Sequence, residues 1–262
     1  MLASLLLALA AAASPLPAGD LAEVRQRGTL RVLAVLDPQR PEFFSQKPDR
    51  PPGFDHEVLK GFADLQRLTL SVVPVATWDG LIPALKAGKG DVIAGRFTAT
   101  DTRRKVIDFT SEVFPYRMVV ITRKPTRPVT TPEQLRREKV GTMKGTNMAE
   151  VITGLAVPPA NVDDTIPTGG FAESLRTGRV SAVIWGVESA IASQREDADL
   201  ELGMFVGTPS SLAFGVRKTD PQLLAALNDY IENFRKTPSW SRLVVKYFGE
   251  AAPEILKKAR QE

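Results

Sequence analysis

The chain has 262 residues, of which 43% are hydrophobic and 24% charged, as expected for one large globular domain or two smaller lobes. It has no cysteine and one histidine, His56, which excludes disulfides, thiol nucleophiles and thiolate or histidine-cluster metal sites. The formal net charge is +4, and Lys and Arg are scattered among acidic residues, which argues against nucleic-acid binding. We expect His56, at a helix start, to face solvent.

The N-terminal residues carry an apolar run, Leu5–Ala13, which has the length of a signal-peptide core and is too short to span a bilayer. We therefore predict a signal peptide over residues 1–19, cleaved near Ala13 or Ala18. No basic residue precedes the run, and a disordered Ala-rich tail is the alternative. No later segment is apolar enough to cross a membrane, so we expect a mature protein in the periplasm.

Helical and strand patterns alternate from residue 20 to residue 94, which indicates a parallel or mixed sheet covered on both faces. Helices are predicted at 20–27 and after Gly53, and strands at 30–35 and 68–75. The second helix has an apolar face formed by Val58, Leu59, Phe62 and Leu65. The proline-rich loop 37–52 carries Phe43 and Phe44, which either contact a ligand or pack against the loop itself.

The stretch from residue 78 to residue 116 combines a helix, a strand and a polar loop. The helix begins at Trp78 and ends at a glycine-rich run, 87–90, because glycine adopts the left-handed conformation of a helix end. A short apolar strand follows at 91–94. Hydroxyls, main-chain amides and guanidinium groups come directly after it, at 95–105. Such groups beyond a strand's C-terminal end are typical of a site for a small anion.

A second α/β series follows a strand at 116–123 and a connector at 124–128. Thr131 and Gln134 predict a capping box at a helix start. Further strands are predicted at 140–142, 180–185 and 202–206, and helices at 146–155, 170–177 and 187–194. Residues 208–216 would carry the chain back toward the first series. Two final helices are predicted at 222–235, capped by Asp220, and at 240–248.

Several motifs occur in an order that resembles one known family. The motifs are Gly28–Val32, Gly53–Asp55, Trp78-x-x-Leu81-Ile82-x-x-Leu85, Gly90-Asp91-x-Ile93, Thr100-x-x-Arg103, Val106-x-Asp108-Phe109-Thr110, Gly145–Thr146 and Gly178–Val180. The set resembles the extracytoplasmic solute-binding proteins of family 3, which serve polar amino-acid ABC importers. The likeness covers nearly the whole mature chain.

The resemblance implies an α/β, two-lobed periplasmic-binding-protein fold of type II, in which each lobe is a mixed sheet flanked by helices. Lobe 1 would comprise residues 20–118 and 214–262, and lobe 2 residues 119–213, with two hinge crossings between them. Strand-like crossings suit a hinge that bends by small dihedral changes at a few residues. A sheet within a single lobe is the alternative.

The resemblance also implies a set of ligand-binding residues in lobe 1. Arg103 would hold a ligand carboxylate through paired N–H donors, and the hydroxyl and amide of Thr98 would reach the same group. Trp78 would stack on the ligand's side chain. The alternatives are a surface arginine and a core tryptophan. Thr100 is expected to cap the turn that presents Arg103.

In lobe 2, the N–H groups of Gly145, Thr146 and Asn147 at a helix start would meet an anion. Trp185 and Glu188 complete the predicted site. Two departures from the family concern the ligand's ammonium group. The acid that the family uses there is replaced by Gly186, with Glu188 expected to point elsewhere, and Arg96 stands where the family has a small residue. An organic acid without an amine therefore competes with an amino acid as the ligand.

The function implied is that of a periplasmic substrate-binding protein of an ABC importer, which closes two lobes on a small carboxylate-bearing ligand. It would act as a monomer, without cofactor or metal, and deliver the ligand to a permease in the inner membrane. One alternative is an enzyme on the same fold, similar to cyclohexadienyl dehydratase, with Glu150, Glu173 or Glu188 as general acid. Another is a sensor or accessory protein that is not coupled to transport.

Overall fold

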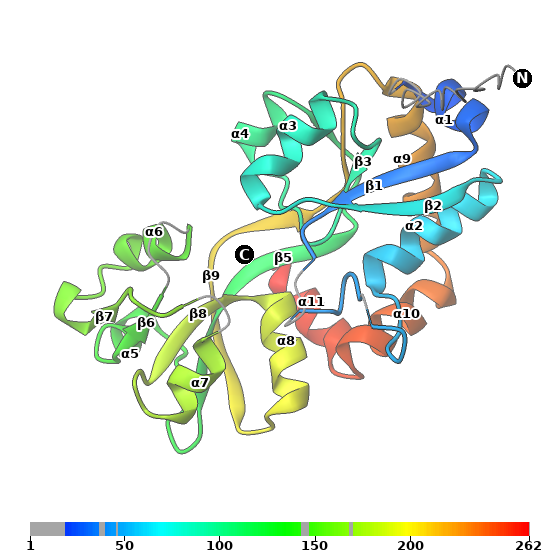
Figure 1. Ribbon diagram of the computed structural model, residues 1–262. Coiled ribbons are helices and arrows are strands. Elements are labelled where there is room, and N and C mark those ends of the chain that lie inside the picture. Colours follow the sequence, from blue (N-terminus) through cyan, green and yellow to red (C-terminus); the bar gives the residue numbers. More distant parts are fainter. Residues whose placement is uncertain (1–18, 37–39, 46, 143–146, 168–169, 262) are drawn as a thin grey trace, which may run out of the picture.

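The computed structural model of the protein describes residues 19–36, 40–45, 47–142, 147–167 and 170–261. Within them the strands form two five-stranded sheets, in the orders β2-β1-β3-β10-β4 and β7-β6-β8-β5-β9. Each sheet combines parallel and antiparallel pairs. Figure 1 shows the two sheets as the centres of two lobes with helices around them. The predicted pair of mixed sheets in an α/β fold is confirmed.

The first lobe takes elements from both ends of the chain. Its strands are β1 (Thr29–Ala34), β2 (Thr69–Pro74), β3 (Val92–Ile93), β4 (Asp108–Phe109) and β10 (Gly215–Val216). Its helices are α1 (Leu21–Arg27), α2 (Phe54–Leu65), η1 (Trp78–Gly80), α3 (Leu81–Lys86), α4 (Asp101–Arg104) and α9 (Pro221–Arg235). The antiparallel strand β10 returns the chain from the second lobe and lies between β3 and β4.

The second lobe is formed by the middle of the chain. Its strands are β5 (Phe114–Arg123), β6 (Val140–Gly141), β7 (Val162–Asp163), β8 (Ala182–Gly186) and β9 (Leu200–Leu212). Its helices are α5 (Pro132–Leu135), α6 (Asn147–Gly154), η2 (Pro159–Asn161), α7 (Phe171–Arg176) and α8 (Val187–Glu196). The predicted capping box at Thr131 and Gln134 is present at the start of α5.

One carboxylate joins the two chain segments that build the first lobe. Asp20 caps α1, where its Oδ1 accepts a hydrogen bond from the main-chain N of Leu21 at 2.8 Å. The same side chain accepts from the main-chain N of Gln222 at 3.0 Å and of Leu223 at 2.7 Å. These two donors belong to the first turn of α9, where the preceding residue, Asp220, makes no capping hydrogen bond with its side chain. Asp20 therefore starts one helix and caps another.

Two long antiparallel strands connect the lobes. β5 pairs with β9 from Phe114 opposite Leu212 to Arg123 opposite Leu200, with a shift of register between Tyr116 and Met118. In Figure 1 these strands run from one lobe into the other. The lobe boundary predicted after residue 118 falls inside β5. A two-stranded ribbon with an irregular register can bend at a few residues, which suits a hinge.

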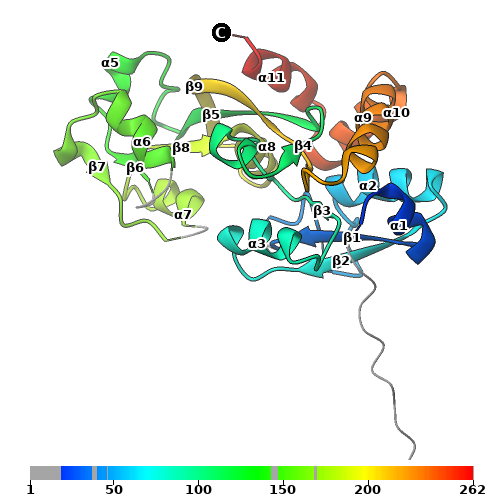
Figure 2. The same cartoon turned by 90° about the horizontal axis from the view of Figure 1, so that it is seen from above.

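The last two helices, α10 (Pro238–Phe248) and α11 (Ala252–Ala259), lie against both lobes. α10 contacts α2, α8 and α9, whereas α11 contacts β5 and α8. Figure 2 shows α11 next to the long strand β5. The helix α11 was not anticipated from the sequence. Its buried face is formed by three residues, Ala252, Leu256 and Ala259.

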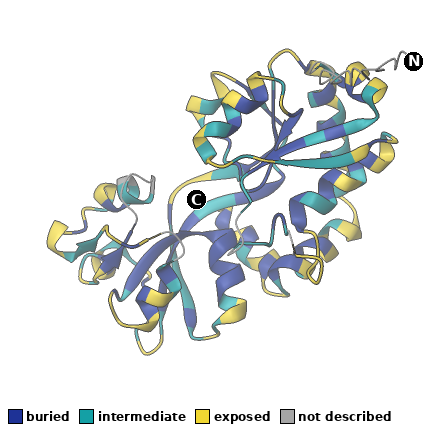
Figure 3. Ribbon diagram, in the orientation of Figure 1, coloured by how far each residue is buried: buried dark blue, intermediate teal, exposed yellow. Residues whose placement is uncertain are grey.

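An aromatic cluster fills the junction between these helices and the strands. Phe43 lies edge-on to Phe54 and Phe114, with ring centres 6.0 and 5.8 Å apart, and Phe248 packs at 5.4 Å from Phe43. Phe43 and Phe44 are 2% and 5% exposed, so both belong to the core. Of the two roles open for them, packing is the one that the structure supports. Figure 3 shows this buried region continuing from one lobe into the other.

Three local predictions differ from the structure. Leu65, placed on the buried face of α2, is 66% exposed because it is the last residue of that helix and projects beyond the helices that cover it. Asp220 precedes α9 but makes no capping bond there, since its carboxylate pairs with Arg217 at 2.6 Å. His56 is half-buried, with its ring edge-on to Phe44 at 6.3 Å, and burial lowers its pKa.

Candidate ligand-binding site

The loop after β3 adopts an unusual backbone conformation. Gly95 and Arg96 have φ angles of 86° and 61°, and Arg96 is thus a non-glycine residue in the left-handed region. The Arg96 guanidinium carbon lies 5.6 Å from the ring centre of Trp78, at the start of η1. Farther along, Thr98 forms an isolated bridge with Leu212 at the end of β9. The loop thereby brings Trp78, Arg96 and Thr98 together next to the hinge strands.

Arg103 is held in a fixed orientation one turn into α4. The hydroxyl of Thr100 accepts a hydrogen bond from the main-chain N of Arg103 at 3.4 Å, so the predicted cap is present. The Arg103 Nη1 donates to the carbonyl O of Thr98 at 2.9 Å, and the guanidinium carbon lies 4.1 Å from the ring centre of Phe97. Burial lowers the pKa of Arg103, and the charge of Asp79 opposes this effect.

Among the described residues, no acidic side chain forms an ion pair with Arg103. A guanidinium that stacks on a ring and is tied by one edge to a carbonyl keeps its other N–H donors in one direction. That arrangement can bind a planar carboxylate through two hydrogen bonds. Its neighbour Arg104 is exposed and stacks on Phe109 at 5.2 Å, which is a surface position.

In the second lobe, Trp185 is the fourth residue of β8, a strand that is buried along its whole length. It is 7% exposed and lies edge-on to Phe171, with ring centres 5.3 Å apart. The guanidinium carbon of Arg40, from the loop after β1, lies 4.5 Å from the Trp185 ring centre. A cation of the first lobe therefore contacts an aromatic ring of the second. No sequence motif includes Arg40, so this contact was not anticipated.

Glu188, in the first turn of α8, folds back over Gly186. A Cβ atom placed on Gly186 would lie 2.6 Å from each of the two carboxylate oxygens of Glu188. The expectation that Glu188 points elsewhere is therefore wrong, because helical side chains lean toward the N-terminus of their helix and Gly186 leaves room there. The carboxylate lies where the side chain of residue 186 would begin.

The Glu188 carboxylate is buried, with the residue 6% exposed. Its Oε1 accepts a hydrogen bond from the hydroxyl of Ser189 at 3.2 Å, and its Oε2 has no hydrogen-bond partner among the described residues. Burial raises the pKa of Glu188, whereas the positive charges of Arg96 and Arg40 act in the opposite direction. Glu188 thus places an acid of the second lobe within electrostatic reach of the Arg96 loop.

Several predicted residues lie elsewhere or outside the described part of the chain. Gly145 and Thr146 are outside the described residues, and of Asn147 the structure gives only its place as the first residue of α6. Glu173, a nominated general acid, is exposed and forms a hydrogen bond with Arg176 at 2.7 Å. The side chain of Glu150 is likewise not described.

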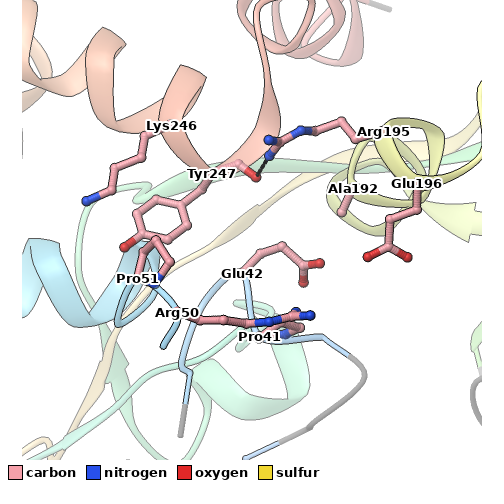
Figure 4. A pocket seen from close by; sticks show the side chains of 9 residues that line it. All are labelled: Pro41, Glu42, Arg50, Pro51, Ala192, Arg195, Glu196, Lys246 and Tyr247. Atoms are coloured by element: carbon pink, nitrogen blue, oxygen red, sulfur yellow. Dashed lines mark hydrogen bonds between the residues drawn. The ribbon is translucent and has the colours of Figure 1, made fainter. Parts of the chain in front are cut away.

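A pocket of about 390 Å³ lies between the loop at 41–51, the C-terminal end of α8 and α10 (Figure 4). None of the predicted binding residues lines it. Arg195 donates a hydrogen bond across this contact from Nη1 to the carbonyl O of Tyr247 at 2.7 Å, and Lys246 pairs with Glu57 at 2.6 Å. Arg195 therefore joins α8 to α10, whereas Lys246 joins α10 to α2.

The described residues contain no group of three or more His, Asp or Glu side chains that could hold a metal ion. None of the helices that the structure describes is both long and apolar enough to cross a membrane.

Two lobes, each built on a mixed sheet and joined by the long strands β5 and β9, have the architecture of a bilobal solute-binding protein. The sequence model of the family described as "Bacterial extracellular solute-binding proteins, family 3" matches residues 32–250, and the chain belongs to this family. It is 28% identical to the L-cystine-binding protein TcyJ of Escherichia coli K12 over 238 residues, which are 88% of this chain and 86% of TcyJ. The type II fold is confirmed by its likeness to a solved structure. This is the ancestral cationic amino acid solute-binding protein AncCDT-1, with a TM-score of 0.77, 26% identity and coverage of 87% of this chain and 99% of that one.

Another relative has a longer chain. The sequence is 23% identical to membrane-bound lytic murein transglycosylase F of Desulfosudis oleivorans over 230 residues. The match covers 86% of this chain but only 50% of that enzyme. The chain thus spans about half the length of the transglycosylase relative and most of the length of TcyJ.

Proposed function

We propose that this chain is a periplasmic binding protein that closes its lobes on a small α-amino acid and delivers it to an ABC permease. The observation that carries the proposal is the fixed guanidinium of Arg103, which forms no ion pair within the described residues and is aimed by Thr98 and Phe97. A carboxylate ligand would complete its hydrogen bonds.

The position of Glu188 supports an amino acid over an acid without an amine. If Gly186 simply replaced the acid that the family has at this position, a bound ammonium group would have no acidic partner. The Glu188 carboxylate fills that place and keeps one oxygen without a hydrogen-bond partner among the described residues. Relatives whose names give cystine, histidine or cationic amino acids as ligands favour the same class.

A matched pair of ligands tests the proposal. L-histidine, L-arginine and L-cystine would each be compared with the corresponding acid that lacks the α-amino group, by thermal shift and calorimetric titration. Binding at 100 times Kd is expected to add about 2.7 kcal/mol to the free energy of unfolding. If the acids without an amine bind as tightly as the amino acids, the proposed ligand class is wrong.

Transport is tested separately from binding. Closure of the two lobes around a ligand should reduce the radius of gyration measured by small-angle scattering, since both lobes contribute binding groups. Unchanged scattering with a saturating, tightly bound ligand would contradict the closure mechanism. Uptake of the same ligand by cells with and without the gene would then distinguish an importer component from a sensor or accessory protein.

An enzyme on the same fold is the second candidate. AncCDT-1 is described as a precursor of cyclohexadienyl dehydratase, and Glu188 is a buried acid whose raised pKa favours a protonated form that could donate a proton. Incubation with prephenate or arogenate, followed for aromatic product, tests this activity. Product formation that disappears in Glu188→Gln would favour the enzyme. If no product forms, the result supports a binding protein without this activity.

A further inference from the structure

Asp55 belongs to the Gly53–Asp55 motif, to which neither the sequence nor the proposed function assigns a role. It lies in the first turn of α2 and is 4% exposed. Its Oδ2 accepts a hydrogen bond from the main-chain N of Gly95 at 2.8 Å. The main-chain N–H of Arg96, next along the loop, favours the ionised form of the same carboxylate. A side chain of one element therefore binds the Gly95 amide and acts on the Arg96 amide of the candidate binding loop.

These two amides belong to the two residues with left-handed backbone. Gly95 has a φ of 86° and Arg96 a φ of 61°, a conformation that a residue with a side chain rarely adopts unless its surroundings enforce it. Phe44 closes the other side of the loop, since a Cβ on Gly95 would lie 3.2 Å from its ring. Asp55 supplies the polar part of this enforcement and Phe44 the apolar part.

The conformation of the loop determines where the Arg96 side chain goes. Its guanidinium carbon lies 5.6 Å from the Trp78 ring centre, and its charge acts on Glu188 across the lobes and on Glu42. A loop that left the left-handed conformation would turn the Arg96 side chain away from both partners. Asp55 thus controls the charge at the site without being placed among the ligand-binding groups.

We propose that Asp55 is the positioning residue of the binding loop: its ionised carboxylate holds the Gly95 amide and acts on the Arg96 amide so that Arg96 faces Trp78 and Glu188, and proton uptake loosens this hold. The role in ligand binding rests on the proposed function. The positioning of the loop itself does not, because it follows from the backbone angles and the hydrogen bond to Gly95.

The expected pH range follows from the burial of this carboxylate. Burial raises the pKa of Asp55 to about 7, while the two amides and the charge of Arg96 favour the ionised form. The charge of Arg96 also acts on Glu42, on the loop after β1, and on Glu188, on α8, and both of these acids are near Arg40 as well. His56 follows Asp55 on the same helix. Each of the titratable groups needs its own control.

The direct test is the amide signal of Gly95 in the ligand-free protein, followed by ¹⁵N–¹H NMR from pH 5 to pH 9. We expect its proton shift to change with a midpoint near pH 7, as the hydrogen bond to the carboxylate weakens on protonation. The step should disappear in Asp55→Asn, which keeps the shape and an acceptor oxygen but does not titrate. It should persist in His56→Gln, in Glu42→Gln and in Glu188→Gln.

A second measurement asks whether the effect reaches the site. In a variant with Trp185→Phe and Trp240→Phe, Trp78 is the one tryptophan, and its emission reports the guanidinium of Arg96 above it. The emission should change over the same pH range, and Asp55→Asn should abolish that change. Asp20→Asn serves as the matched control, since it also removes a carboxylate that accepts hydrogen bonds from main-chain amides, in this case at two helix starts. It should lower stability without affecting Trp78 emission.

The proposal is overturned if the Gly95 signal does not titrate, or if its midpoint is lost in one of the three control variants instead of in Asp55→Asn. It is also overturned if Asp55→Asn lowers the melting temperature as Asp20→Asn does and leaves the Trp78 pH response intact. None of these outcomes depends on a ligand, so they are independent of any failure to find amino-acid binding.

Discussion

The two halves of the candidate site differ in how their sequence relates to their geometry. In the first lobe, a short strand, a tight loop and a capped turn follow one another, and Thr98, Thr100 and Arg103 lie where the motif spacing places them. In the second lobe, the acid is two residues away from the position that spacing indicates, and its side chain folds back over Gly186. Motif spacing can predict the positions of residues that are placed by main-chain geometry. It cannot predict the position of a group that depends on a side-chain rotamer.

The largest expected effect is on the first-lobe half. Replacing Arg103 with alanine should weaken amino-acid binding by more than about 100-fold, because a charge-assisted pair of hydrogen bonds is lost. Arg104→Ala is the matched control, since Arg104 is adjacent and exposed, and its affinity should stay within about threefold. Calorimetric titration of both variants measures the contrast. Equal losses would mean that Arg103 is a surface residue like its neighbour.

A smaller loss is expected when the second-lobe half is altered through its backbone. Gly186→Ala places a methyl group 2.6 Å from the Glu188 carboxylate oxygens and must displace them. We expect affinity for an amino acid to fall by about 10- to 100-fold, a cost of roughly 1.4 to 2.7 kcal/mol. Gly154→Ala is the control, since nothing lies within 4 Å of its Cβ position. Full affinity in Gly186→Ala would separate Glu188 from the ligand.

Glu188→Gln should change selectivity more than affinity. The amide keeps the shape of the carboxylate but removes its charge, so the advantage of an amino acid over the acid without an amine should shrink about tenfold. The two Kd values, measured for the variant and the parent, give this ratio directly. An unchanged ratio would show that the ammonium is bound elsewhere, and that the second-lobe half has a structural role alone.

The smallest effect concerns stability and pH. Burial raises the pKa of Asp55 from 3.8 to about 7, so between these values the folded protein holds a proton that the unfolded chain has released. The free energy of unfolding should therefore decrease as pH rises, by about 1 kcal/mol between pH 6 and pH 8. Urea unfolding at these two pH values measures the change. In Asp55→Asn the decrease should be smaller, and an identical decrease would assign it to other groups.

Much of the fold could be predicted because its signals are local. Asp20 before α1, Thr131 before α5 and Gly249 after α10 each end or start a helix through their own chemistry, and each helix end lies within one residue of its predicted place. The packing of α11 across β5 and α8 could not be predicted. It depends on contacts with two segments that lie far away in the chain, Phe114–Arg123 and Val187–Glu196, which no periodic pattern records.

For the candidate site, the residues of the first lobe named from the sequence stay predictions, and the contacts that position them were missed. Asp55 is part of a sequence motif, but its role could not be predicted, because a carboxylate at a helix start is equally suited to bind that helix's own amides. Its bond to Gly95 joins residues forty positions apart. Arg40 lies next to residues that the structure does not describe, and its contact with Trp185 is visible only once both lobes are placed.

The double use of Asp20 has a consequence for processing of the polypeptide. This carboxylate, close behind the predicted signal peptide, binds main-chain amides at the starts of α1 and α9, whose sequences are separated by two hundred residues. A proteolytic cut that removed residue 20 would uncap both helices in one event, at a cost of about 1 kcal/mol for each. A cleavage that removes the predicted signal peptide and keeps both helix starts capped must therefore lie before Asp20.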